Sequence, residues 1–129
     1  MTYSVGDELP HFVIESVSTD AMKLWARFLA DPNPIHIDPK VVESKGLGTK
    51  VINQGPINVA YMMNALLLAF PTGRIEAMES RFLDNVYGGD RIVAGGHVES
   101  IEANRIKCRV TLDVDGRGTV NEATATIVL

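Results

Sequence analysis

The sequence is poor in cysteine, in basic residues and in long apolar runs, and each shortage excludes a class of protein. One cysteine in 129 residues cannot form an internal disulfide, and no Cys/His cluster has the spacing of a zinc site. Twelve basic residues face sixteen acidic ones, for a formal net charge of -4, which argues against a nucleic-acid-binding protein. We therefore expect neither a metal nor a nucleic-acid partner.

The apolar runs are too short for a membrane span. The most apolar stretch covers residues 59–70 and is interrupted by Asn64, short of the roughly 18 residues that cross a bilayer. The first ten residues contain charges, glycine and proline in place of a basic start and an apolar core, so we expect no signal peptide. These features predict a cytoplasmic protein without a membrane partner.

The remaining composition is that of an ordinary globular chain. Apolar residues make up 46% and charged residues 22%, close to globular averages. A chain of this length buries roughly two-thirds of its unfolded surface and suits one domain, here residues 1–129.

The prolines divide the chain into two parts, because all six lie at or before Pro71 and the rest of the chain has none. In the first half we predict a strand over 12–17, a helix capped by Ser18 or Thr19 that ends near Ala30, and a short helical turn over 39–45. Four apolar residues give the first helix an apolar face: Met22, Trp25, Phe28 and Leu29. A mobile connector is expected over 46–51.

A long apolar helix follows the tripeptide Gln54-Gly55-Pro56. Proline suits the first helical position, and the helix should run over 57–70. Because it is apolar nearly all round, protein must cover it on most sides.

The second half predicts antiparallel strands that supply this cover. Apolar and polar residues alternate strictly over 105–114, as in a half-buried strand, and a glycine-containing turn leads to another strand over 120–129. Earlier strands are predicted over 75–87 and 91–103, with Gly95-Gly96 marking a bulge or bend. The fold class is therefore α+β, with a curved antiparallel sheet wrapped around a long central helix.

The densest polar segment is DPNPIHID, residues 31–38. Two prolines restrict the backbone between Asp31 and His36, so a carboxylate and an imidazole can face one small volume. This pairing can bind and activate one water molecule. Alternatively, the segment is an ordinary turn, because Asp-Pro and Asn-Pro are common in turns and a single histidine can lie nearby by chance.

This segment resembles the signature of the MaoC-like dehydratases, which include the (R)-specific enoyl-CoA hydratases. The family pattern is a small residue, Asp, any residue, Asn-Pro, an aliphatic residue, His, any residue and Asp, and residues 30–38 match it. The resemblance extends to the opening 5–10, to Gly55 before the long helix, and to a strand followed by Gly89-Asp90. It implies a hot-dog fold.

The resemblance implies reversible hydration of a trans-2-enoyl-CoA to an (R)-3-hydroxyacyl-CoA. Asp31 would be the general base, and His36 would position the water and help to move its proton. The Gly55 N–H would stabilise charge on the thioester oxygen, where a helix start favours negative charge. Alternatively, Gly55 only begins the helix and has no part in the chemistry.

Four further residues are predicted to contact the substrate: Asn33, Gln54, Asn58 and Met62. Asn33 can also brace the loop, and Asp38 can cap the turn at Pro39. Asn58 and Met62 are equally typical of a helix core. Two positions depart from the family: Gln54 stands where many members have histidine, and no serine lies two turns into the helix.

The expected partners are an acyl-CoA or acyl-carrier thioester and a second copy of the chain. No cofactor is expected, because coenzyme A enters as part of the substrate. Exposed sheet edges favour a homodimer or a multiple of it. Two alternatives remain: a hot-dog thioesterase, and a non-catalytic partner subunit of a heteromeric hydratase.

Overall fold

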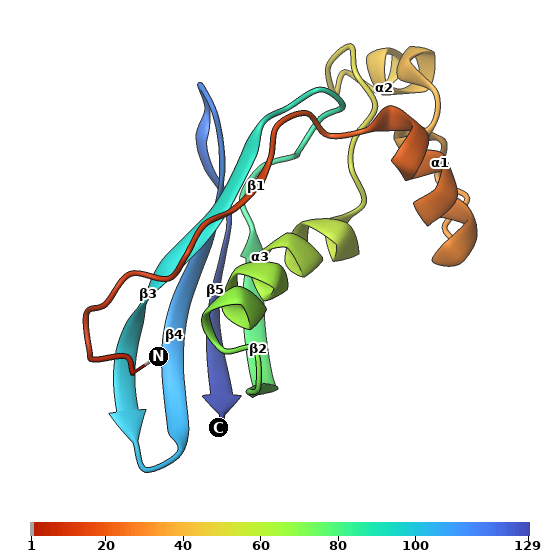
Figure 1. The fold of residues 1–129 in the computed structure, drawn as a ribbon. Coiled ribbons are helices and arrows are strands. Elements are labelled where there is room, and N and C mark those ends of the chain that lie inside the picture. The colour runs from red at the N-terminus through yellow and green to blue at the C-terminus, as the bar shows by residue number, and fades with distance from the viewer. Residues whose placement is uncertain (1) are drawn as a thin grey trace.

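A five-stranded antiparallel sheet carries a long helix across one face (Figure 1). The computed structural model describes residues 2–129, and the strand order is β1-β3-β4-β5-β2. The strands are β1 (Phe12–Ile14), β2 (Arg74–Phe82), β3 (Ile92–Glu102), β4 (Arg105–Val114) and β5 (Gly118–Val128). The helices are α1 (Thr19–Phe28), the 3₁₀ turn η1 (Pro34–His36), α2 (Pro39–Ser44) and α3 (Gly55–Ala69). The predicted α+β class and element order are confirmed.

The alternation in β4 determines which face of the sheet is buried. Its apolar residues are buried under α3, and the intervening polar residues are exposed or half-buried. The same face of β5 is lined by Ala123, Ala125 and Ile127. The two alanines leave room for α3 to pack closely on the sheet.

The bulge predicted at Gly95-Gly96 lies elsewhere. Both glycines pair regularly with β4, and the register shifts between Val98 and Ser100. A Cβ on Gly96 would lie 1.9 Å from the carbonyl oxygen of Arg109. The glycine therefore permits close approach of the neighbouring strand, and the prediction of a bulge there was wrong.

Helix α3 is covered on one side only. Met62, Ala65 and Leu66 are buried against the sheet, whereas Leu67 and Leu68 on the other side are exposed, Leu68 by 55%. The prediction that protein covers the helix on most sides is thus wrong for one chain, because the five-stranded sheet lies on one side of the helix. No helix among residues 2–129 is long and apolar enough to cross a membrane.

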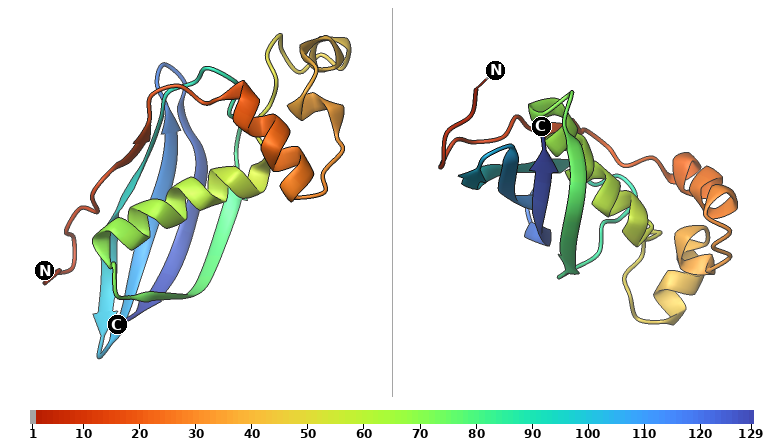
Figure 2. Two further views of the ribbon diagram at one scale, coloured as in Figure 1. Left: turned by 45° about the vertical axis from the view of Figure 1, so that its right-hand side comes forward. Right: turned by 90° about the horizontal axis from the view of Figure 1, so that it is seen from below.

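Helices α1 and α2 lie beyond the end of the sheet, as both views of Figure 2 show. The Ser18 hydroxyl accepts a hydrogen bond from the Ala21 N–H at 3.0 Å, which confirms the predicted cap. Met22 is fully buried, but Phe28 is 80% exposed. The predicted apolar face is therefore only partly covered, because α1 extends past the sheet that would bury its last turn.

Candidate active site

Asp31 follows directly after the end of α1. Ala30 adopts a left-handed conformation (φ 50°), which stops the helix after Leu29. The Asp31 N–H then donates to the Ala26 carbonyl at 2.9 Å. This hydrogen bond fixes the Asp31 backbone to the end of α1 and so limits where its carboxylate can lie.

The loop after Asp31 is braced by short-range hydrogen bonds. The Asn33 N–H donates to Asp31 Oδ1 at 3.2 Å, and Asn33 Oδ1 accepts from the Ile35 N–H at 3.2 Å. Pro34 begins η1, which turns the chain so that His36 faces back toward Asp31. The predicted bracing role of Asn33 is confirmed. Asp38 caps α2 through the Lys40 N–H, also as predicted.

His36 is held in one orientation by a backbone carbonyl. Its ring is buried, with 7% of the residue exposed, and Nδ1 lies 2.6 Å from the Ile52 oxygen. A carbonyl only accepts, so Nδ1 carries a proton and donates it to Ile52, which leaves Nε2 to face Asp31. Nε2 lies 3.2 Å from Asp31 Oδ2. A carboxylate and an imidazole nitrogen therefore face one small volume, where both can hydrogen-bond to one water molecule.

The Ile52 carbonyl is itself fixed by strand-like pairing on both sides. The Ile52 N–H donates to the Ile35 carbonyl at 2.9 Å, next to His36. Ile52 also forms a bridge with Tyr87, and the Asn53 N–H donates to the Val86 carbonyl at 2.7 Å. The loop between β2 and β3 thus positions the acceptor of the His36 ring.

The start of α3 presents one backbone donor without a helical acceptor, the N–H of Gly55, because Pro56 has no N–H and Ile57 donates to the Gln54 carbonyl. Gln54 is the N-cap residue, and its Nε2 donates to the Met22 carbonyl at 2.9 Å, while Oε1 is buried without a partner. The N–H of Gly55 has no acceptor within the helix, as in the first turn of any helix. A Cβ on Gly55 would lie 3.2 Å from the Phe82 ring. Packing against Phe82 therefore gives this glycine a structural reason besides its predicted oxyanion role.

The remaining predicted contacts lie deeper in the molecule. Asn58 is buried, and its Oδ1 accepts from Asn53 Nδ2 at 2.9 Å. Met62 and Gln54 are fully buried. The structure thus brings Asp31 and His36 together, and it buries Gln54 at the N-cap of α3 and Asn58 and Met62 on the inner side of that helix. Their contact with a substrate stays a prediction.

Sequence reasoning missed Asn53, which links the site to α3. Its Nδ2 donates to Asn58 Oδ1 and lies 3.2 Å from the Tyr61 hydroxyl. Burial raises the pKa of Tyr61, and the hydrogen bond with Asn53 opposes part of that rise. No motif identifies Asn53 in the sequence, because its role depends on the Val86 carbonyl, which is distant along the chain and close to Asn53 only in the folded protein.

Other reactive groups lie away from the pair. Cys108 is buried in β4, where burial and the charge of Glu99 raise the pKa of its thiol to about 11. Within residues 2–129 no group of three or more His, Cys, Asp or Glu side chains could hold a metal ion. A groove of about 740 Å³ opens at the C-terminal end of α3, between Tyr3, Leu68 and Ile101, whereas His36 contacts Ile52, three residues before α3 begins at Gly55.

Comparisons with known proteins identify the fold and the family. No curated protein matches the chain. The (R)-hydratase from A. caviae superimposes with a TM-score of 0.90 at 17% identity, over 99% of this chain and 98% of that one. The R-hydratase PhaJ1 from Pseudomonas aeruginosa gives 0.85 at 20% identity, over 97% and 81%. A chain of the ChsH1-ChsH2 complex from Mycobacterium tuberculosis gives a TM-score of 0.88 at 17% identity, over 99% of this chain and 99% of that one.

These similar structures confirm the hot-dog fold: an antiparallel sheet with a long helix packed on it. The model of the MaoC like domain matches residues 4–117, which include all of the Asp31–His36 loop, the start of α3 and the loop between β2 and β3. The chain therefore belongs to the MaoC-like dehydratase family, a family of hydratases and dehydratases.

Proposed function

We propose that this protein catalyses the reversible hydration of a trans-2-enoyl-CoA to an (R)-3-hydroxyacyl-CoA. The observation that carries the proposal is the pairing of Asp31 Oδ2 with His36 Nε2 at 3.2 Å, in a ring orientation set by the Ile52 carbonyl. Membership of the MaoC-like family supports hydratase or dehydratase chemistry in general. The acyl-CoA substrate and the (R) configuration are the finer part of the proposal.

The pair would act on a water molecule that is hydrogen-bonded to both side chains. Asp31 takes a proton as the water oxygen attacks C3 of the enoyl thioester, and His36 orients the water and helps to move that proton. The electron pair of the C2–C3 double bond moves toward the thioester carbonyl. The Asp31–His36 pair then gives this proton to C2, so that water is added across the double bond and the site returns to its starting protonation state.

The start of α3 would stabilise the negative charge that develops on the thioester oxygen. The N–H of Gly55 has no helical acceptor, and the helix dipole favours negative charge at this end. Donors that are already oriented before the reaction contribute most to this kind of stabilisation. Asn33, Gln54, Asn58 and Met62 are the proposed substrate contacts, and no cofactor or metal takes part.

The working protein is proposed to be a homodimer or a multiple of it. Leu67 and Leu68 leave an apolar strip open on α3, and the edge strand β2 carries Phe82, which is also exposed. Such an edge and strip are usually covered in a soluble protein. A second copy would cover both and help to close the acyl pocket. Light scattering at micromolar concentration that reports a monomer would contradict this.

A partner subunit of a heteromeric hydratase is the second candidate. The similar ChsH1-ChsH2 structure is a complex of two different chains. The intact Asp31–His36 pair favours a catalytic chain over an inactive partner. Co-purification of a different hot-dog chain, together with inactivity of the isolated chain, would favour the second candidate.

The test is an assay of purified protein on enoyl-CoAs of increasing length with two simultaneous readouts. Loss of the enoyl absorbance without release of free thiol, and an (R)-hydroxyacyl product, is the expected result. Thiol release would identify a thioesterase. Inactivity of the pure homomeric protein on every enoyl thioester would contradict the proposal.

A further inference from the structure

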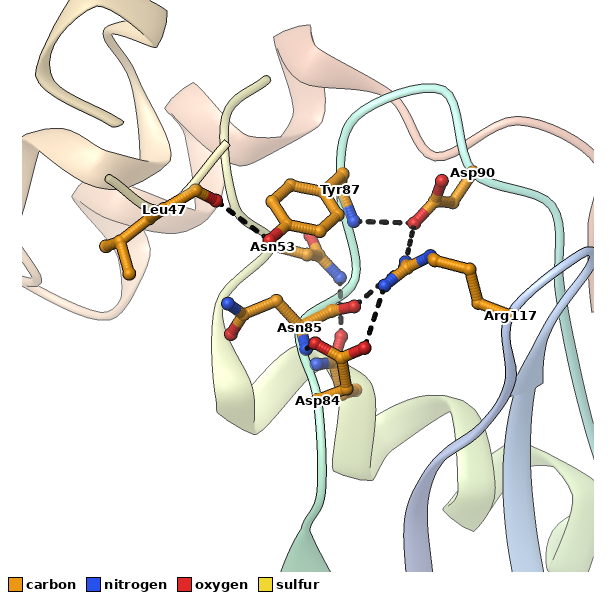
Figure 3. A network of polar contacts seen from close by, with 8 residues as sticks. Leu47, Asn53, Asp84, Asn85, Tyr87, Asp90 and Arg117 are labelled. Atoms are coloured by element: carbon orange, nitrogen blue, oxygen red, sulfur yellow. Dashed lines mark hydrogen bonds and ion pairs between the residues drawn. The ribbon is translucent and has the colours of Figure 1, made fainter. Parts of the chain in front are cut away.

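A lone arginine braces the loop on which the His36 acceptor depends. Arg117 lies in the turn between β4 and β5, and its guanidinium donates to Asp84 Oδ2 at 3.2 Å, to the Asn85 carbonyl at 2.9 Å and to Asp90 Oδ2 at 2.5 Å. It also lies 5.0 Å from the centre of the Tyr87 ring. Figure 3 shows the guanidinium surrounded by these groups. The planar fork of arginine suits such simultaneous contacts, and lysine cannot reproduce them.

The braced loop, residues 84–90, in turn holds the segment that carries the His36 acceptor. The Tyr87 hydroxyl donates to the Leu47 carbonyl at 2.8 Å, and the Gly88 N–H donates to the Val51 carbonyl at 2.9 Å. The Val86 carbonyl accepts from the Asn53 N–H at 2.7 Å. Residues 47–53 are therefore attached to this loop at both ends.

The last of these bonds reaches His36 through a single peptide group. The carbonyl of Ile52 and the N–H of Asn53 belong to the same planar peptide unit and point in opposite directions. The N–H binds the Val86 carbonyl, and the carbonyl accepts from His36 Nδ1 at 2.6 Å. Hydrogen bonds in such a chain polarise one another, so a shift at Val86 changes both the place and the strength of the His36 contact.

We propose that Arg117 is a positioning residue for His36, acting through the 84–90 loop and the Ile52–Asn53 peptide. Arg117 touches neither the pair nor the water, and the inference of a catalytic consequence rests on the proposed hydration. Without the guanidinium, Asp84 and Asp90 lose their shared cation, and the Asn85 carbonyl loses its donor. The Val86 carbonyl beside it is then held less firmly, by the burial of its side chain and the contacts of Tyr87 and Gly88 alone, and the distance from the His36 ring to Asp31 changes.

The test compares Arg117→Met with Arg105→Met. Arg105 is a matched control, because it makes a two-bond contact with Glu76 on the sheet and does not contact the 84–90 loop. The first readout is the proton resonance of His36 Nδ1 in protein labelled with ¹⁵N-histidine, because a short hydrogen bond moves this resonance downfield. The second is kcat against KM on the best enoyl-CoA, with the melting temperature measured alongside.

We expect Arg117→Met to move the Nδ1 resonance upfield and to lower kcat between about 10-fold and 100-fold with KM nearly unchanged, as misplacement of a catalytic group does. Arg105→Met should leave the resonance and kcat as they are. If Arg117→Met does not fold, Arg117→Lys makes the same comparison with the charge retained. An unmoved resonance, an equal shift in both variants, or a moved resonance with unchanged kcat overturns the proposal. If the wild type hydrates no enoyl-CoA, the proposed function fails, and the resonance alone decides the positioning role.

Discussion

The sheet with α3 and the segment 31–53 are held together by different forces. The sheet and α3 share a continuous apolar core, with Leu66, Val110 and Leu112 fully buried. Segment 31–53 buries three apolar residues, Val42, Val51 and Ile52, and individual hydrogen bonds hold the rest, such as that from His36 to Ile52. Burial tolerates small errors of position, whereas a hydrogen bond weakens steeply with misalignment. Stability is therefore expected to reside in the first region and activity in the second.

The largest expected effect is in the second region. His36→Ala should lower kcat for enoyl-CoA hydration by about 10²-fold to 10⁴-fold, the range for loss of an acid–base group. The free energy of unfolding should fall by only about 1–3 kcal/mol, because the buried Ile52 carbonyl loses its donor. Steady-state kinetics and urea unfolding of the same preparation check both values. Equal kcat in the variant and the wild type would contradict the division of roles.

The converse effect is expected in the core. Leu112→Ala should lower the free energy of unfolding by about 2–5 kcal/mol, because Leu112 is fully buried under α3 and its removal leaves a cavity. Under conditions where the variant is folded, kcat should stay close to that of the wild type. Thr111→Ala, on the other face of β4, is the control and should cost less than about 1 kcal/mol. Similar losses for both would show that β4 is not the core strand.

A smaller effect in the core depends on pH. The pKa of the Cys108 thiol is raised from 9.0 to about 11 in the folded protein. Between these values the unfolded chain has released this proton and the folded chain keeps it, so stability falls as pH rises from 9 toward 11. In Cys108→Ala the free energy of unfolding should fall less over this interval. Parallel curves for the two proteins would contradict the burial of this thiol.

The smallest effect is expected at the start of α1. Ser18→Ala should lower the free energy of unfolding by about 1 kcal/mol, because the Ala21 N–H loses its cap. The exposed Ser16, two residues earlier, gives a matched control in Ser16→Ala. Thermal unfolding of both variants measures the difference. A lower kcat for Ser18→Ala than for Ser16→Ala, measured at equal folded concentration, would show that the cap also positions Asp31.

The contrast between the two regions also explains what could be predicted from the sequence. The strict alternation over 105–114 predicted β4 with its correct bounds, because burial on one face leaves a period of two in the sequence. The exposure of Phe28 could not be predicted, because it depends on where the sheet ends. The strand predicted over 12–17 is confirmed only for Phe12–Ile14.

In segment 31–53 the motif predicted the Asp31–His36 pair, but not its support. The prolines and Asn33 act locally, so their effect could be read from neighbouring residues. The acceptor of the His36 ring lies 16 residues away and is a backbone carbonyl, which no side chain identifies. The loop between β2 and β3 that holds this carbonyl is further still along the chain.

The central claim is that the Asp31 carboxylate accepts a proton from water held beside His36. Asp31→Asn tests it most directly, because the amide keeps the size of the side chain and cannot act as the base. The measurement is the rate of hydration of the best enoyl-CoA by wild type and variant at equal folded concentration. We expect a rate at least about 10²-fold lower in the variant. Undiminished hydration by Asp31→Asn would contradict it.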